Sequence, residues 1–231
     1  MEETELQNEL ASIRSIMERS SKFISLSGLS GILAGVYALI GAGLGYELIH
    51  DANSKFEDLV SRIRMAEPVV TTTPSFNRYD LDYSSLIWKL FAIAAVVLLA
   101  SVVTAILLSS RQAKRKNQPM WGAASKSLLF NMMVPLITGG CLIAVLVFFK
   151  LNDFFHPYYG LVAPASLIFY GLALVSASNF TFGEVKYLGI CEIFLGLYAA
   201  CLPGHGLLFW ALGFGVLHIV YGARIYFKYD K

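Results

Sequence analysis

The sequence predicts an all-α, multi-span membrane protein with six transmembrane helices, preceded by an amphipathic helix. Two observations support this prediction. Hydrophobic residues make up 56% of the 231 positions and charged residues only 15%, a balance that exceeds what the core of one soluble domain of this size requires. The apolar residues are also gathered into long uncharged stretches, so we expect them to face lipid.

The amphipathic helix is expected in residues 1–21, in the cytoplasm or at the membrane interface. Its apolar side chains recur at steps of three and four, and charged residues occupy the rest of the helical wheel. The apolar stripe consists of Leu6, Leu10, Ile13 and Met17. Such a helix can lie along the inner membrane surface or against the bundle, or it can join subunits as a short coiled coil.

Residues 22–231 form the predicted transmembrane domain. Four uncharged segments reach or exceed the roughly 20 residues that cross a bilayer as a helix. They are residues 23–46, 90–110, 127–149 and 157–183. Two shorter apolar segments, 187–202 and 206–223, flank the Pro203 and Gly204 turn, which favours a helical hairpin. The predicted number of spans is therefore six.

A long outer loop, residues 50–84, is expected between the first two spans. Its first part, residues 53–65, has a helix-like pattern, whereas residues 69–74 are rich in β-branched side chains and end in proline, which disfavours a helix. At about 35 residues the loop is long for a connection, and such loops often cap a bundle or contact a ligand.

Positive charges predict the orientation of the chain. The loop that holds Arg111, Lys114, Arg115 and Lys116 has the densest cluster of cations, which places it in the cytoplasm under the positive-inside rule. Because the number of spans is even, both termini are then cytoplasmic, and the protein is expected in the inner (plasma) membrane. The cations follow the inner membrane face rather than one basic stripe, so lipid headgroups and not nucleic acid are their expected partners.

Small residues predict how the helices pack. They recur at steps of three and four in the first span and in the last two spans, which lets helix backbones approach closely. The strip of the first span comprises Gly28, Gly31, Gly35, Ala38, Ala42 and Gly45. If the protein forms a homo-oligomer, these Gly-rich faces or the N-terminal helix are the expected contacts.

The hairpin from Gly189 to Gly222 has glycines at both ends and a Pro-Gly turn. In this it resembles the repeat unit of the HdeD-like bacterial inner-membrane proteins, which have six spans and are linked to acid stress. Residues 20–31 are similar to the opening of other multi-span bacterial inner-membrane proteins. These resemblances imply a bacterial membrane protein of six spans, and they supply no reaction, substrate or functional residue.

Glu192 and His218 are the candidate interior site. They are equally distant from the turn near residue 205, so we expect them to touch at the same depth in the hairpin. An unpaired carboxylate at that depth is unfavourable unless it is protonated or has a partner. Tyr198 and Tyr221 are expected within about one helical turn of the same level. One interpretation is a functional site that binds a ligand or transfers protons. The other is a buried hydrogen-bonded pair that stabilises the hairpin.

Three further histidines, His50, His156 and His205, fall at the outer ends of spans in this topology. Carboxylates lie near two of them in sequence, and imidazole with carboxylate suits zinc or a similar ion. A shared zinc site is expected if these histidines converge. Otherwise they are ordinary residues of the membrane interface.

Transport or sensing of a small solute or ion through the interior site is the predicted function. The first alternative is a non-catalytic structural or stress-response protein, in which Gly-rich packing encloses Glu192 and His218. The second is an intramembrane hydrolase, because residues 28–31 match the GxSG motif of rhomboid intramembrane proteases, which requires Ser30 within hydrogen-bond reach of His218. In rhomboid proteases this serine lies in the fourth span rather than the first, so an enzyme is the less favoured class.

Overall fold

The computed structural model describes residues 27–66, 83–116, 121–148 and 159–230, and all regular structure in these ranges is helical. The helices are α2 (Gly28–Ala66), α3 (Tyr83–Arg115), α4 (Ala123–Phe148), α5 (Val162–Ala177), α6 (Glu184–Cys201), α7 (Gly206–Trp210) and α8 (His218–Ile225). Short 3-10 turns, η1 (Tyr159–Leu161) and η2 (Ser178–Phe180), flank α5. Two π-helical segments, η3 (Ala211–Leu217) and η4 (Tyr226–Asp230), continue α7 and α8. The all-helical prediction is therefore confirmed for this part of the chain.

Five helical stretches of the described chain are long and apolar enough to cross a membrane. They are Gly28–Arg62, Ser85–Arg115, Ala123–Val147, Tyr159–Phe180 and Gly206–Asp230. Each contains one of the predicted spans or most of it. The remaining predicted span coincides with α6, which is 18 residues long but carries the charged residues Glu184, Lys186 and Glu192. These three charged residues set α6 apart from the 18-residue apolar stretches of the other five helical segments.

Helix α2 is longer than the sequence analysis predicts. It runs without a break through the expected end of the first span and into the expected outer loop, over 39 residues or about 58 Å. Residues 47–66 contain neither glycine nor proline, so nothing in the backbone ends the helix there. The helix-like pattern of residues 53–65 is confirmed. Residues 69–74 and the amphipathic segment 1–21 lie outside the described residues.

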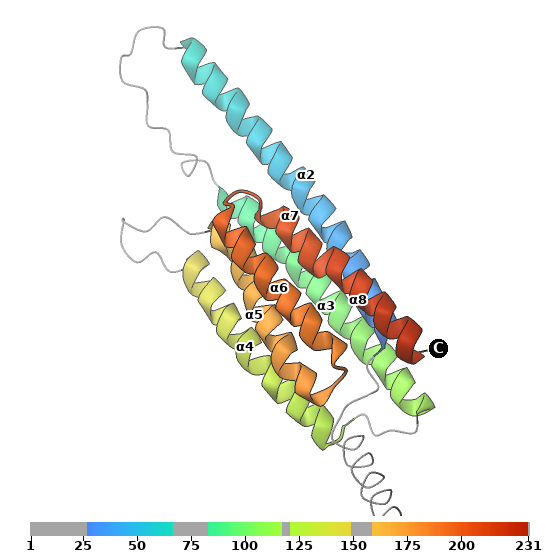
Figure 1. Ribbon diagram of the computed structural model, residues 1–231. Helices are drawn as coiled ribbons and strands as arrows, with labels where there is room; N and C mark the ends of the chain where they lie inside the picture. Colours follow the sequence, from blue (N-terminus) through green and yellow to red (C-terminus); the bar gives the residue numbers. More distant parts are fainter. Residues whose placement is uncertain (1–26, 67–82, 117–120, 149–158, 231) are drawn as a thin grey trace, which may run out of the picture.

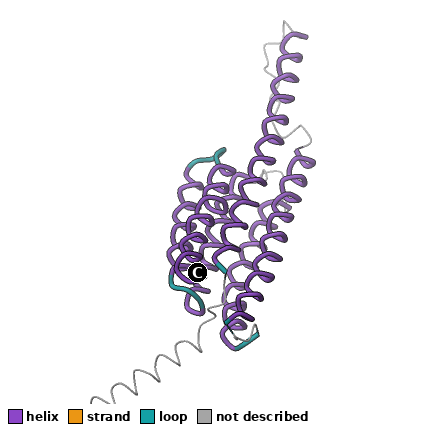
Figure 2. Tube along the Cα trace, turned by 90° about the vertical axis from the view of Figure 1, so that its right-hand side faces the viewer, coloured by secondary structure: helices purple, strands orange, loops and turns teal. Residues whose placement is uncertain are grey.

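The second half of α2 projects beyond the rest of the bundle (Figures 1 and 2). Its surface carries two ion pairs between residues four positions apart, Lys55 with Asp51 at 2.7 Å and Arg62 with Asp58 at 2.9 Å. All four side chains are largely exposed, as is typical of a helix in water. This half of α2 is thus a polar extension of an otherwise apolar helix.

The helices pack as two connected groups. In one group α5 lies between α4 and α6, and in the other α2 lies between α3 and the arm formed by α7, η3 and α8 (Figure 1). Helix α6 also packs against this arm, which joins the two groups through the predicted hairpin. The hairpin turns at Gly204, whose φ of 93° is the left-handed conformation that favours glycine.

Glycines form the closest helix contacts, as the small-residue strips predict. A Cβ atom added at Gly35 of α2 would lie 2.5 Å from the carbonyl oxygen of Gly215, and one added at Gly222 would lie 2.6 Å from the amide nitrogen of Ile32. Helices α5 and α6 meet in the same way, because a Cβ atom at Gly189 would lie 2.6 Å from the carbonyl oxygen of Gly171. These three contacts leave no room for a side chain.

Asp230 of η4 forms hydrogen bonds with α2 and α3 at the end of the bundle opposite to the projecting half of α2. Its Oδ2 atom accepts hydrogen bonds from the backbone N–H of Gly28 at 2.7 Å and from the Ser27 hydroxyl at 3.2 Å. Its Oδ1 atom accepts one from the Gln112 side chain of α3 at 2.9 Å. A carboxylate at a helix N-terminus satisfies a free N–H group and interacts favourably with the helix dipole. Asp230 therefore acts as a distant cap for α2.

Candidate functional site

Glu192 lies in the interior of the bundle, on the face of α6 that packs against α5. Its exposed fraction is 0%. Gly189 and Gly196, which lie three residues before and four residues after it, both contact α5 closely, so the close approach of these two helices encloses the carboxylate. Neither oxygen of Glu192 has a hydrogen-bond partner among the described residues. The sequence thus places a carboxylate where water does not reach and leaves it without a conventional partner.

Space for this carboxylate comes from Gly213 of η3. A Cβ atom at this position would collide with Oε2 of Glu192 and with Cδ2 of Leu167 on α5. Leu167 is itself fully buried. Glycine is therefore required at position 213, because any larger residue would push the carboxylate or the leucine out of place.

His218 begins α8 and is 7% exposed. Its Nδ1 atom lies 3.0 Å from the carbonyl oxygen of Gly213, and its Nε2 atom lies 2.8 Å from the hydroxyl of Tyr170 on α5. Because a carbonyl oxygen can only accept, Nδ1 carries a hydrogen. In the neutral ring Nε2 then accepts the hydrogen of Tyr170. The hydrogen-bond network thus assigns the tautomer of His218.

Glu192 and His218 meet across the interface between α6 and α8. The Nδ1 atom of His218 lies 3.4 Å from Oε1 of Glu192, so the contact that the hairpin register predicts is confirmed. At this distance and orientation the two groups attract each other without a full hydrogen bond. The ring therefore stands between Tyr170 on one side and Glu192 on the other.

The π-helical segment η3 sets this geometry. In a π-turn the carbonyl group of one residue is aligned with the residue five positions later, and Gly213 and His218 have this separation. The wider turn directs the Gly213 carbonyl at the imidazole ring. Single π-turns within helices occur frequently at functional sites.

Aromatic rings surround the imidazole on its remaining faces. Phe214 stacks on His218 with ring centroids 6.0 Å apart, and Tyr170 lies 5.3 Å from His218 and 5.0 Å from Phe214 by the same measure. The polar groups of the site are therefore held in an apolar shell. Electrostatic interactions are stronger in such a shell than in water.

Comparisons with protein-family models, with curated proteins and with solved structures find no match. The resemblance of the 189–222 hairpin to the HdeD-like repeat unit therefore remains a prediction from those residues.

The structure does not bring Tyr198 and Tyr221 to the pair. Tyr198 is 60% exposed and its ring meets Phe209 edge to face, whereas the Tyr221 hydroxyl lies 3.8 Å from the sulfur of Cys191. For Tyr198 the reason is rotation along the helix, because a step of six residues from Glu192 turns the side chain by about 240°. Matching depth alone did not account for this rotation.

Tyr170 is the residue of the site that sequence analysis missed. It is the only titratable residue of α5. A lone tyrosine in an apolar span is a weak signal on its own. Its closeness to His218 depends on α5 packing against the hairpin, which no pattern in the sequence specifies.

His50 and His205, the two outer histidines that the structure describes, are not part of this site. His50 is exposed, with its ring 6.2 Å from that of Tyr46, and His205 is exposed in the turn before α7. His156 lies outside the described residues. Within the described ranges, no group of three or more His, Cys, Asp or Glu side chains lies close enough to hold a metal ion. The shared zinc site of the three histidines thus stays a prediction.

The hydrolase alternative requires a contact that the described residues do not contain. The Ser30 hydroxyl donates to the carbonyl oxygen of Ser27 at 2.6 Å. Both ring nitrogens of His218 are occupied by Gly213 and Tyr170. Ser30 is therefore bonded to the backbone of its own helix start, and among the described residues no base contacts its hydroxyl.

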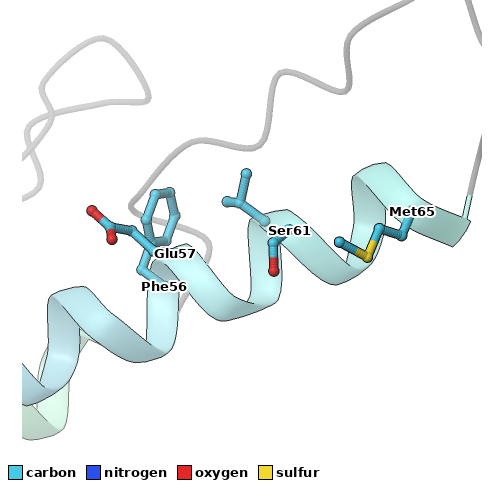
Figure 3. A pocket seen from close by; sticks show the side chains of 5 residues that line it. Phe56, Glu57, Ser61 and Met65 are labelled. Atoms are coloured by element: carbon cyan, nitrogen blue, oxygen red, sulfur yellow. The ribbon is translucent and has the colours of Figure 1, made fainter.

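A shallow groove lies far from the pair, on the projecting half of α2 (Figure 3). Phe56, Glu57, Val60, Ser61 and Met65 line it. These side chains come from successive turns of one helix, and they converge on no polar centre. The groove adds no candidate chemistry.

Proposed function

We propose that the protein senses or transports a small ion or solute at the Glu192 and His218 site. In this proposal the chain crosses the inner membrane six times, with α6 as one of the spans and with both termini in the cytoplasm. The observation that supports it most is the enclosed carboxylate of Glu192, whose oxygens have no hydrogen-bond partner in the described chain. A buried carboxylate without hydrogen bonds destabilises the fold unless a cation neutralises it, so a binding role accounts for its presence.

Enclosure of the site favours a mechanism with a conformational change. Glu192 is closed off by Gly213 and Leu167, so an ion or solute reaches it only when α6 and the arm of α7, η3 and α8 separate. Gly213, which faces Glu192 across this interface, presents no side chain there. The arm can therefore move away from α6 without withdrawing a side chain at that position.

A structural role is the second candidate, and the same enclosure favours it. In that case the pair would hold the hairpin closed, while the Gly-rich contacts hold α6 against α5. A structural pin normally uses its polar atoms in hydrogen bonds. Because the oxygens of Glu192 have no hydrogen-bond partner in the described chain, they favour the binding role over the structural role.

Substitutions that keep the shape of the side chains separate the two candidates. Glu192→Gln and His218→Gln are introduced into the full chain, with Glu57→Gln on the exposed half of α2 as the matched control. Purified proteins are reconstituted in liposomes, and the uptake of protons, sodium, potassium and zinc is followed with ion-specific dyes. Binding is followed by the thermal shift that each ion causes.

The proposal expects an ion response in the wild type and in the control that is lost in both site variants, with normal folded yield. Loss of folded protein in the site variants would support the structural pin instead. An ion response that survives Glu192→Gln would overturn the proposal.

A further inference from the structure

We propose that Tyr170, His218 and Glu192 form a proton relay that ends at Glu192, so that the ion handled at this site is the proton. This inference rests on the proposed function, because it names the ion of the same site. Three features of the geometry support it: the lack of ligands for any larger cation, the two-sided hydrogen bonding of His218, and the order in which the three side chains lie.

Within the described part of the chain, no cluster of carboxylate, thiol or imidazole groups surrounds Glu192 that would hold a metal cation. Sodium, calcium and magnesium take several oxygen ligands, whereas the carboxylate faces the carbon atoms of Leu167, the position of the missing side chain of Gly213 and the ring of His218. The Nδ1 hydrogen of that ring already points to the carbonyl oxygen of Gly213, so this oxygen is engaged. A proton needs no ligand shell. It is therefore the cation that the surroundings of Glu192 accept.

His218 has the geometry of a two-sided proton carrier. Nε2 lies 2.8 Å from the Tyr170 hydroxyl, and Nδ1 lies 3.4 Å from Oε1 of Glu192. Imidazole can take a proton at one nitrogen while it releases one from the other. The three side chains come from α5, α8 and α6, so a shift of any of these helices changes the relay.

In the transfer step Tyr170 passes its hydroxyl proton to Nε2 of His218, and an N–H bond forms there as the Nδ1–H bond breaks. The Nδ1 proton forms an O–H bond with Oε1 of Glu192, which neutralises the carboxylate. A hydronium ion from water replaces the proton of Tyr170. The ring is neutral before and after the step and has changed its tautomer.

In the described conformation the relay is interrupted at its last link. The distance of 3.4 Å between Nδ1 and Oε1 exceeds a normal hydrogen bond, and Nδ1 donates to Gly213 instead. A small approach of α6 to α8 would complete the link. The interface between these helices therefore acts as the gate of the relay.

Few other titratable groups surround Glu192. Helix α7 and η3 carry none, and α5 carries only Tyr170. Helix α8 adds Tyr221 and Arg224 to His218, and the Tyr221 hydroxyl is engaged with Cys191 of α6. Glu184, at the start of α6, lies about 12 Å away along the helix axis. A pH response of Glu192 thus reports on Tyr170 and His218.

Infrared spectroscopy of the full chain in lipid nanodiscs tests the end of the relay. A protonated carboxyl group absorbs as a C=O stretch separate from ionised carboxylates, and this band shifts in heavy water. We expect such a band at neutral pH in the wild type and in Glu57→Gln, and its loss in Glu192→Gln. If the band is absent from the wild type, or remains in Glu192→Gln, the inference is wrong.

The relay itself is tested by the rate at which the Glu192 band grows after a rapid drop from alkaline to neutral pH. Tyr170→Phe and His218→Gln should slow this rate by roughly tenfold to a hundredfold, since each removes a proton-transferring group. Tyr187→Phe, at an exposed tyrosine of α6, should leave the rate unchanged. If His218→Gln fails to fold, Tyr170→Phe alone decides. An unchanged rate in Tyr170→Phe would overturn the relay.

These outcomes are distinguishable from those of the proposed function. A Glu192 band with the expected kinetics and no ion response in liposomes would support the relay and contradict transport. A response to sodium, potassium or zinc with an ionised Glu192 would support the function and contradict the relay.

Discussion

Glu192 occupies the space that a side chain at Gly213 would need. Adding a methyl group there should therefore displace the carboxylate or Leu167. We expect Gly213→Ala to lower the free energy of unfolding by about 1–3 kcal/mol, the usual effect of overpacking a core. The thermal unfolding of the purified protein in detergent measures this loss.

Gly140→Ala is the matched control for this substitution. Gly140 lies within α4 with no atom of the described chain near the position of an added Cβ atom. Alanine favours a helix more than glycine does, so this change should leave the unfolding temperature unchanged or raise it. Equal destabilisation by the two substitutions would contradict the packing that we describe around Glu192.

Asp230→Ala should destabilise the protein by about 1–2 kcal/mol, because it removes the cap of α2 and the acceptor of Gln112. Asp51→Ala is the control, since it breaks only an exposed ion pair on α2 and should change the free energy of unfolding by about 0.5 kcal/mol or less. Chemical unfolding followed by circular dichroism compares the two variants. If Asp230→Ala lowers the free energy of unfolding no more than Asp51→Ala does, the cap contributes nothing to stability.

Stability should fall in acid through Glu184. Burial raises the pKa of this carboxyl, but hydrogen bonds from Lys228 and Tyr229 and the charge of Lys228 outweigh it, so that the pKa lies below the ordinary 4.5. The stabilising contribution is therefore complete above the unfolded pKa and is lost as the pH falls through the lowered folded pKa. The difference in unfolding temperature between the wild type and Glu184→Gln should shrink over this acid range. A difference that does not depend on pH would show that ionisation of Glu184 is not the cause.

Both termini should report from the cytoplasm when they are fused to compartment-sensitive reporters. This follows from the cation-rich segment 111–116 and from an even number of spans. A C-terminal reporter that is active outside the cytoplasm would mean an odd number of spans. Either the fifth or the sixth predicted span, 187–202 or 206–223, would then not cross the membrane.

Zinc should raise the unfolding temperature if His50, His156 and His205 converge, since a ligand that binds only the folded state stabilises it. Replacing any one of the three with alanine should then remove most of the shift, because each supplies one ligand. Cys141→Ala, at an exposed cysteine of α4, serves as the control. The absence of any shift at saturating zinc would leave the histidines as interface residues.

The fold class and the contact between Glu192 and His218 could be predicted from the sequence, because both depend on local patterns. Apolar runs define the spans, and the symmetry of a tight hairpin places Glu192 opposite His218. Tyr170 could not be predicted in the same way, since its position depends on which helix packs against the hairpin. The length of α2 was also missed, because hydropathy marks where a helix leaves lipid and not where it ends.

Helix α2 has a mechanical consequence. It is continuous from the hydrogen bond between Gly28 and Asp230 to the projecting end near Ala66, and it contains no proline at which bending would concentrate. About 28 Å of its length exceeds the hydrocarbon core of a bilayer. Such a rod acts as a lever: a sideways push on its projecting end near Ala66 is transmitted along the helix. The torque is then delivered to the Asp230 junction, on the opposite side of the bundle, without an intermediate joint.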